Sequence, residues 1–230
     1  MSLDPKFQKF STASPIIASF NYTDVADGTG KINVNGTAKK TSAGTTYNLE
    51  SVSDNYSTSI ETTSVNADGT QFVKMIDLDF DLATFNKSRT LFGTSTFQIC
   101  QNLARANSGS GGQHLQSYII IKVRKWDGAT ETEIGSVQSQ TITDNVVLAT
   151  GTSTIHLMDI EIATRTNFAK GDTLRVTIEG WSKAQVGGYD ARLTIGHDPQ
   201  NRDGTYIIPS TDDPETLTTF KSEISFNLTE

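Results

Sequence analysis

The sequence has one cysteine, three histidines and no long apolar run, and each shortage excludes a kind of protein. Cys100 has no second cysteine to pair with, so no intrachain disulfide forms. His114, His156 and His197 lie far apart, and none stands at a spacing typical of metal ligands. No stretch approaches the roughly 18 apolar residues that would span a bilayer. We therefore expect no metal, no cofactor and no membrane partner.

Basic residues are also in short supply. The chain has 19 lysines and arginines against 26 aspartates and glutamates, a net charge of −7. The densest basic groups are Lys39 with Lys40, and Lys122 to Lys125; the second lies opposite an apolar face of one strand, as on a solvated strand face. A basic stripe of the kind that binds nucleic acid is missing, so no nucleic-acid partner is expected.

The common catalytic motifs are missing as well. The chain has no Gly-x-Ser-x-Gly elbow and no glycine-rich phosphate loop before a helix. Two acids flanking a sugar would suit a glycosidase, and the candidates are Asp77, Asp79, Asp81, Asp159 and Glu161. Such enzymes usually line their groove with aromatic residues, which make up only 8% of this chain. The sequence therefore predicts that the protein is not an enzyme.

The N-terminus, Met-Ser-Leu-Asp-Pro-Lys-Phe, lacks the apolar segment of a signal peptide, which predicts a protein that is made in the cytoplasm and is not exported through a signal peptide. Residues 1–15 are polar, and Pro5 and Pro15 interrupt them, with Phe7 and Phe10 as isolated apolar anchors. We expect them to form an arm that packs on a neighbouring subunit. Residues 16–230 are expected to form a single domain, because β-sandwiches often reach this length undivided.

Short segments of alternating apolar and polar residues dominate the rest of the chain. The clearest of them follows a Lys-Gly-Asp turn, where Leu174, Val176 and Ile178 point one way and the polar residues between them point the other. Gly171 can adopt the positive φ of a tight turn, and the side chain of Asp172 can cap it. This segment predicts a core strand entered through a tight turn.

The same alternation predicts about a dozen strands and no amphipathic helix longer than two turns. In residues 155–163 the alternation fails between Leu157 and Met158, which predicts a β-bulge near Leu157. The fold class is therefore all-β, an antiparallel two-sheet sandwich of the jelly-roll type. The expected strands cover residues 16–23, 31–38, 45–52, 56–65, 72–82, 90–100, 118–126, 132–138, 155–163, 173–181, 189–195 and 215–228.

Residues 168–181 resemble the Gly-Asp turn and core strand of jelly rolls of the tumour-necrosis-factor/C1q type and of viruses. Over residues 16–228 the Thr-, Asn- and Gly-rich composition, with the arm and the single cysteine, resembles capsid decoration or accessory proteins of tailed viruses. The resemblance implies a non-enzymatic structural protein on the outer surface of a virion. Its partners would be capsid or other virion proteins, and it would form a homo-oligomer, with a trimer favoured.

Contacts in such a particle are expected from the arm and from one polar loop. The arm would contribute Phe7 and Phe10, and the loop after residues 189–195 would contribute His197, Asp198 and Arg202. Two other interpretations of this loop stay open, a Ca²⁺ site and an ordinary loop held by Asx turns.

A second hypothesis is a carbohydrate-binding or adhesin module at a fibre or tail tip. It requires exposed aromatic rings on which a sugar can stack. The candidates are Trp126, Trp181, Tyr189 and Tyr206.

Overall fold

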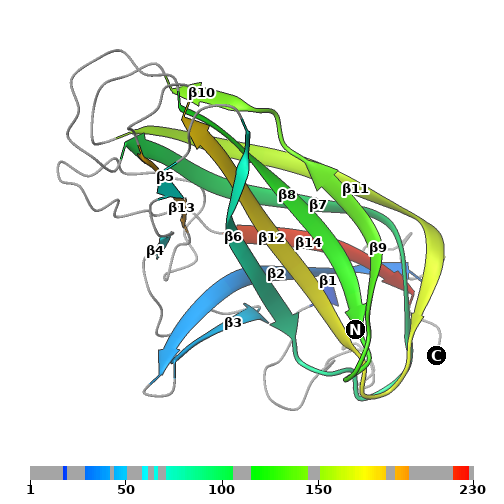
Figure 1. Ribbon diagram of the computed structural model, residues 1–230. Coiled ribbons are helices and arrows are strands. Elements are labelled where there is room, and N and C mark those ends of the chain that lie inside the picture. Colours follow the sequence, from blue (N-terminus) through cyan, green and yellow to red (C-terminus); the bar gives the residue numbers. More distant parts are fainter. Residues whose placement is uncertain are drawn as a thin grey trace.

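The computed structural model describes residues 18–19, 29–41, 44–50, 59–61, 65–66, 71–105, 115–144, 151–184, 190–196 and 220–227. Every regular element in this part is a strand, and none of it forms a helix long and apolar enough to cross a membrane (Figure 1). The strands are β1 Ala18–Ser19, β2 Thr29–Thr41, β3 Gly44–Glu50, β4 Ser59–Glu61, β5 Val65–Asn66, β6 Val73–Leu82, β7 Arg89–Arg105, β8 Leu115–Trp126, β9 Glu131–Gln138, β10 Ile142–Asp144, β11 Thr152–Phe168, β12 Thr173–Ala184, β13 Asp190–Gly196 and β14 Phe220–Asn227.

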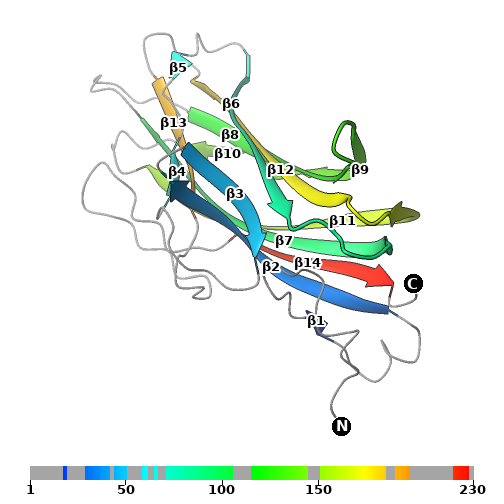
Figure 2. The same ribbon diagram turned by 90° about the horizontal axis from the view of Figure 1, so that it is seen from below.

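The strands form two packed layers, which confirms the predicted antiparallel sandwich. One layer places β9 and β10 beside β8, followed by β12 and β6. The other places β11 beside β7, followed by β14 and β2, and Figure 2 shows β7, β14 and β2 side by side. Strand β3 connects the layers, since it pairs with β2 and, in the one parallel pairing among the described strands, with β6.

Apolar side chains from both layers fill the space between them. Leu174, Val176 and Ile178 of β12 have no exposed surface, as the alternation of this strand predicts. Burial of one such side chain contributes about 1.5–3 kcal/mol relative to leaving it exposed. The largest fully buried side chains of the described part are Phe80, Phe97, Phe168, Ile99, Leu103, Leu115, Ile119, Ile121 and Ile162.

The turn before β12 has the predicted chemistry. Gly171 has a φ of 97°, a value that side-chain-bearing residues rarely adopt. The carboxylate of Asp172 accepts a hydrogen bond from the backbone N–H of Ala169 at 2.6 Å and forms an ion pair with Lys125 at 2.8 Å. The side chain of Asp172 therefore caps the turn that connects β11 to β12.

The predicted bulge near Leu157 is wrong. The register of β11 with β7 is continuous from Thr152 to Ile162 and shifts only between Ile162 and Thr166. The prediction assumed that Leu157 points into the core, whereas 72% of its surface is exposed and His156 is buried instead. The alternation of β11 is regular, but a polar residue takes an inward position and an apolar residue an outward one.

Candidate functional site

Strand β11 lies at an edge of its layer. Among the described strands it pairs only with β7, and β9, at the edge of the other layer, pairs only with β8. The two edges approach each other near Gly135, where a Cβ added to this residue of β9 would lie 2.6 Å from the Ile160 side chain and 3.9 Å from the backbone oxygen of Glu161. Before this contact, over residues 152–159, none of the described strands pairs with the second edge of β11. In an edge strand about half of the backbone N–H and C=O groups point away from the sheet.

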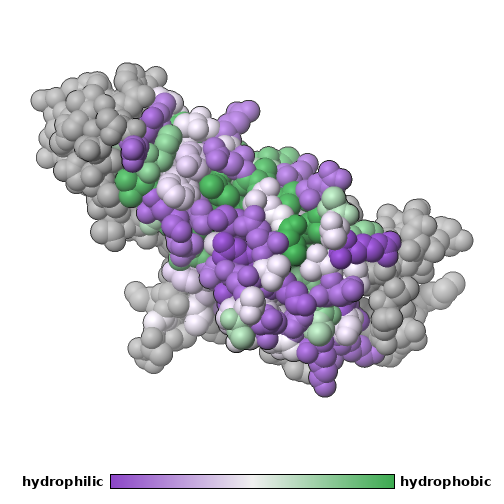
Figure 3. Space-filling model, turned by 45° about the vertical axis from the view of Figure 1, so that its right-hand side comes forward, coloured by the Kyte–Doolittle hydropathy of each residue, from purple (hydrophilic) through white to green (hydrophobic). Residues whose placement is uncertain are grey.

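A groove runs along this open edge and is called here the β9–β11 groove. Its volume is about 500 Å³, and residues 137–142 line one side and residues 154–159 the other. Ile155 and Leu157 stand at its rim with 45% and 72% of their surfaces exposed. Figure 3 turns the side of the molecule that carries β9 and β11 forward, and apolar patches lie there between hydrophilic side chains. The edge therefore combines unpaired backbone with exposed apolar side chains.

His156, which lines the groove, begins a buried polar chain that crosses between the layers. His156 of β11 donates its Nε2–H to the side-chain oxygen of Gln101 on β7 at 2.9 Å. The Gln101 amide in turn donates to Ser117 Oγ on β8. Burial away from water lowers the pKa of His156 below its ordinary value. This histidine is therefore neutral in the folded protein at physiological pH and serves as a hydrogen-bonding link.

Stability should fall as the solution becomes acidic because of His156. The unfolded chain binds a proton at this histidine below about pH 6.5, whereas the folded chain resists protonation until a lower pH. As the pH falls from about 7.5 to 5, urea titrations should show a loss of unfolding free energy that His156→Gln lacks. Equal pH slopes for the two proteins would contradict this assignment.

The outer face of the β6–β12–β8–β9 layer carries a network of ion pairs. Arg175 of β12 donates two hydrogen bonds to Asp81, at 2.7 and 2.8 Å, and one to Glu131 at 3.1 Å. Asp79 lies 3.5 Å from the same guanidinium. Hydrogen bonds to Asp81 are the main reason that the pKa of Arg175 is raised. The acidic row on β6 is thus held in part by a cation of the neighbouring strand.

A second group on this face surrounds Glu179, which is only 5% exposed. Its carboxylate lies 2.7 Å from Lys122 Nζ and 3.6 Å from Lys74 Nζ, and it accepts a hydrogen bond from the Trp181 indole at 3.1 Å. Burial alone raises the pKa of Glu179, but the hydrogen bonds from Lys122 and Trp181 outweigh it, so the pKa lies below its ordinary value. The acid therefore stays charged.

The two tryptophans do not form a common platform. Trp181 stacks on Tyr118 with ring centroids 6.1 Å apart, whereas Trp126 lies under the Arg175 guanidinium at 4.9 Å. They occupy opposite ends of the β8–β12 ladder. The other predicted site residues lie outside the described residues and stay predictions, as does the homo-oligomer: Phe7, Phe10, Tyr189, His197, Asp198, Arg202 and Tyr206.

The candidate acids of a glycosidase groove do not come together. Asp77, Asp79 and Asp81 lie on β6, whereas Asp159 and Glu161 lie on β11, which does not pair with β6. Within the described ranges, no group of three or more His, Cys, Asp or Glu side chains is placed to hold a metal ion.

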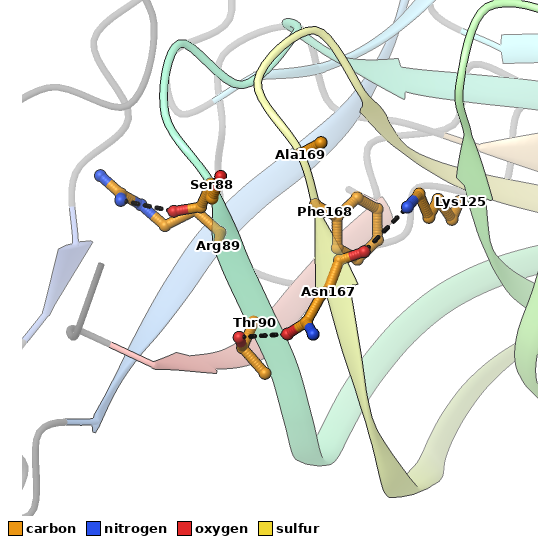
Figure 4. Close-up of a pocket in the computed structure, with 7 residues that line it drawn as sticks. All are labelled: Ser88, Arg89, Thr90, Lys125, Asn167, Phe168 and Ala169. Carbon is orange, nitrogen blue, oxygen red and sulfur yellow. Dashed lines mark hydrogen bonds between the residues drawn. The ribbon is translucent and has the colours of Figure 1, made fainter.

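A second cavity of about 500 Å³ contains two cations whose donors are already engaged (Figure 4). Lys125 donates to the backbone oxygen of Asn167 at 2.8 Å, and Thr90 donates to the Asn167 side chain at 2.7 Å. The Arg89 guanidinium donates to the Ser88 carbonyl at 2.9 Å and is directed away from Lys125. Because the two cations do not converge, this cavity is a weaker candidate than the β9–β11 groove.

The edge of β11 was not predicted from the sequence. Ile155, Leu157, Asp159 and Glu161 are all exposed and alternate with buried residues, so they share one face of the strand. The sequence pattern that could have revealed it is that the two apolar and the two acidic residues stand at every second position, so all four lie on the same face of a strand. A prediction from hydropathy places Ile155 and Leu157 in the core, and their exposure is therefore not expected.

Comparison with known proteins gives structural likenesses only. No family model and no curated protein matches this sequence. Among solved structures, an α-amino acid ester hydrolase aligns with 64% of this chain at 9% identity and a TM-score of 0.39. An aminopeptidase from a marine sediment archaeon, Thaumarchaeota archaeon, aligns with 85% at 8% identity and a TM-score of 0.45. The chain spans 25% and 37% of the length of these two proteins.

These likenesses correct two predictions. The sequence predicted a non-enzymatic virion structural protein, but the first structures that the chain resembles are hydrolases. A structure of infectious bursal disease virus, Gx strain, aligns with 79% of this chain and 40% of its own at 11% identity and a TM-score of 0.25. This is a distant likeness to one virus structure, and it does not extend to decoration proteins of tailed viruses. Because all these TM-scores lie below 0.5, they assign no activity to this chain.

Proposed function

We propose that this chain binds polypeptide segments in an extended conformation, and that such a segment adds as a further strand to the open edge of β11. The observation that carries the proposal is Leu157, 72% exposed on a strand whose second edge no described strand covers. Backbone hydrogen bonds to an edge give such binding its affinity, and alternate side chains give it specificity.

The open edge of β11 lacks the features that protect edge strands from pairing with strands of other molecules. Natural edge strands are commonly interrupted by charges, prolines or bulges near their exposed parts. The irregularity of β11 lies beyond Ile162. Its charged residues Asp159, Glu161 and Arg165 all lie on that same side of the exposed apolar pair. Residues 152–157 carry neither charge nor proline, apart from the buried His156. An exposed apolar pair on an unprotected edge is the pattern of an interaction site.

The experiment selects random nonapeptides displayed on phage with the full 230-residue chain as bait. Selected peptides should slow amide hydrogen exchange in residues 152–159, because an added strand protects the N–H groups that point away from β7. Leu157→Lys should weaken their binding by about tenfold or more, since it removes an apolar contact at the edge.

Val73→Lys is the matched control. Val73 is exposed to 37% but lies on β6, in the layer opposite β11, so this substitution should leave peptide affinity unchanged. Failure to select any peptide, or selected peptides that leave exchange in residues 152–159 unaltered, would reject polypeptide addition at β11.

A further inference from the structure

The acids beside the apolar pair on β11 have no ion-pair partner among the described residues, unlike several acids of the opposite layer. On the outer face of the β6–β12–β8–β9 layer, Asp77 and Glu179 are each bound by at least one lysine. Asp159 and Glu161 are exposed, and neither forms an ion pair with a lysine or arginine of the described residues. Within the described part of the chain, Asp159 accepts a hydrogen bond from Thr96 Oγ1 at 2.7 Å.

These charges lie in line with the apolar rim of the β9–β11 groove. Along β11 the outward residues follow in the order Ile155, Leu157, Asp159 and Glu161, at a spacing of about 6.6 Å between alternate residues. Neighbouring β7 gives uncharged partners at the acidic positions, because Thr96 is opposite Asp159 and Thr94 is opposite Glu161. The face therefore presents two apolar positions followed by two negative ones.

An incoming strand would meet these positions in reverse order. Every pairing of β11 and its neighbour β7 is antiparallel, and antiparallel pairs are the more stable kind. An antiparallel segment whose first outward residue is opposite Asp159 places its third and fifth residues opposite Leu157 and Ile155. A side chain opposite Asp159 is also within diagonal reach of Glu161.

We propose that the segment bound by β11 carries the pattern basic-x-apolar-x-apolar, with a lysine or arginine between Asp159 and Glu161. This inference rests on the function proposed above and names the class of its ligand. The basic residue comes first in the pattern because Asp159 follows the apolar pair along β11 and the added strand is antiparallel. The residues written x face the groove, whose wall includes Ser139 and Thr141, and small or polar side chains suit these positions.

The test uses synthetic peptides and fluorescence anisotropy with the full chain. The probe is Thr-Lys-Ser-Val-Ser-Val-Thr, and its controls are the same peptide with glutamate in place of lysine and the peptide with the reversed sequence. The lysine peptide should bind about tenfold more tightly than the glutamate peptide at low salt. The difference should shrink at about 0.5 M NaCl, because salt screens exposed charges. The reversed peptide should bind more weakly, because in the same register it places a valine opposite Asp159 and its lysine opposite Ile155.

The double variant Asp159→Asn with Glu161→Gln separates charge recognition from strand addition. It should reduce the preference for lysine over glutamate to less than about threefold, while residues 152–159 remain protected from hydrogen exchange. Equal binding of the lysine and glutamate peptides, with β11 protected, would overturn the pattern and leave strand addition intact. No protection by any peptide would overturn both.

A second copy of the chain is the competing occupant. Sedimentation that reveals a dimer, together with its loss in Leu157→Lys and no binding of the lysine peptide, would overturn the basic segment as the ligand. Binding of the lysine peptide, with an oligomeric state that is the same in the wild type and in Leu157→Lys, is the expected result.

Discussion

Replacing Gly151 with alanine is expected to lower the free energy of unfolding by about 3 kcal/mol. Gly151 has a φ of 68°, and it stands directly before β11. An added Cβ would lie 2.3 Å from the backbone oxygen of Leu103 and 2.8 Å from Cα of Ala104. Backbone atoms of the central strand β7 cannot move aside as the end of a flexible side chain can. The chain would therefore have to shift at the entrance to β11.

Gly171→Ala is the matched control for this substitution. Gly171 also has a positive φ, of 97°, but an added Cβ would meet nothing within 4 Å. It should therefore show only the conformational cost, about 1–2 kcal/mol. Urea denaturation followed by circular dichroism measures both variants. If both variants lost the same free energy of unfolding, the chain near residue 151 would accommodate the added Cβ beside β7 without further cost.

Replacing Glu179 with alanine is expected to cost about 2–3 kcal/mol at neutral pH. The substitution leaves Lys122, whose side chain is 21% exposed, without its acid, and leaves the Trp181 N–H without its acceptor. A fully buried pair broken in this way costs about 3–5 kcal/mol, and the partial exposure of Lys122 reduces the figure. Asp77→Ala is the control, because the Asp77 side chain is 54% exposed and its pair with Lys74 should contribute less than about 1 kcal/mol.

The effect of Glu179→Ala should depend on pH. Since the pKa of Glu179 is lower in the folded protein than in the unfolded one, its stabilisation is complete above the unfolded value and is lost as the pH falls through the folded one. The difference in unfolding free energy between the wild type and Glu179→Ala should therefore shrink on acidification from neutral pH to about pH 3. A difference that stays constant over this range would show that Glu179 acts through packing and not through its charge.

The strand pattern and the turn chemistry could be predicted because they are local properties of the chain. Leu174, Val176 and Ile178 alternate with polar residues, and a strand is the structure that places such residues on one face. Gly171 and Asp172 have the side chains that a tight turn requires. Each of these signals lies within a few residues, so the sequence alone is sufficient to locate them.

The same local patterns gave a wrong prediction for residues 155–163, because the sequence does not show which face of a strand points into the core. Leu157 and His156 are neighbours of opposite polarity, and a prediction from hydropathy sends the leucine inward. The hydrogen bond from His156 to Gln101, which is 55 residues away in the sequence, makes the inward position favourable for the histidine. Hydropathy cannot reveal a partner so remote.

For this protein the sequence by itself determined the class of fold, an all-β sandwich, since alternation and turns are encoded in short stretches. Tertiary structure alone decided where the strands meet: that Arg175 and Glu179 satisfy charges of neighbouring strands, and that β11 lies at an edge with Ile155 and Leu157 exposed. The physical reason is that strand order depends on pairings between residues far apart in the chain. The candidate site arises from that order, because an edge is defined by the strand that does not pair with it.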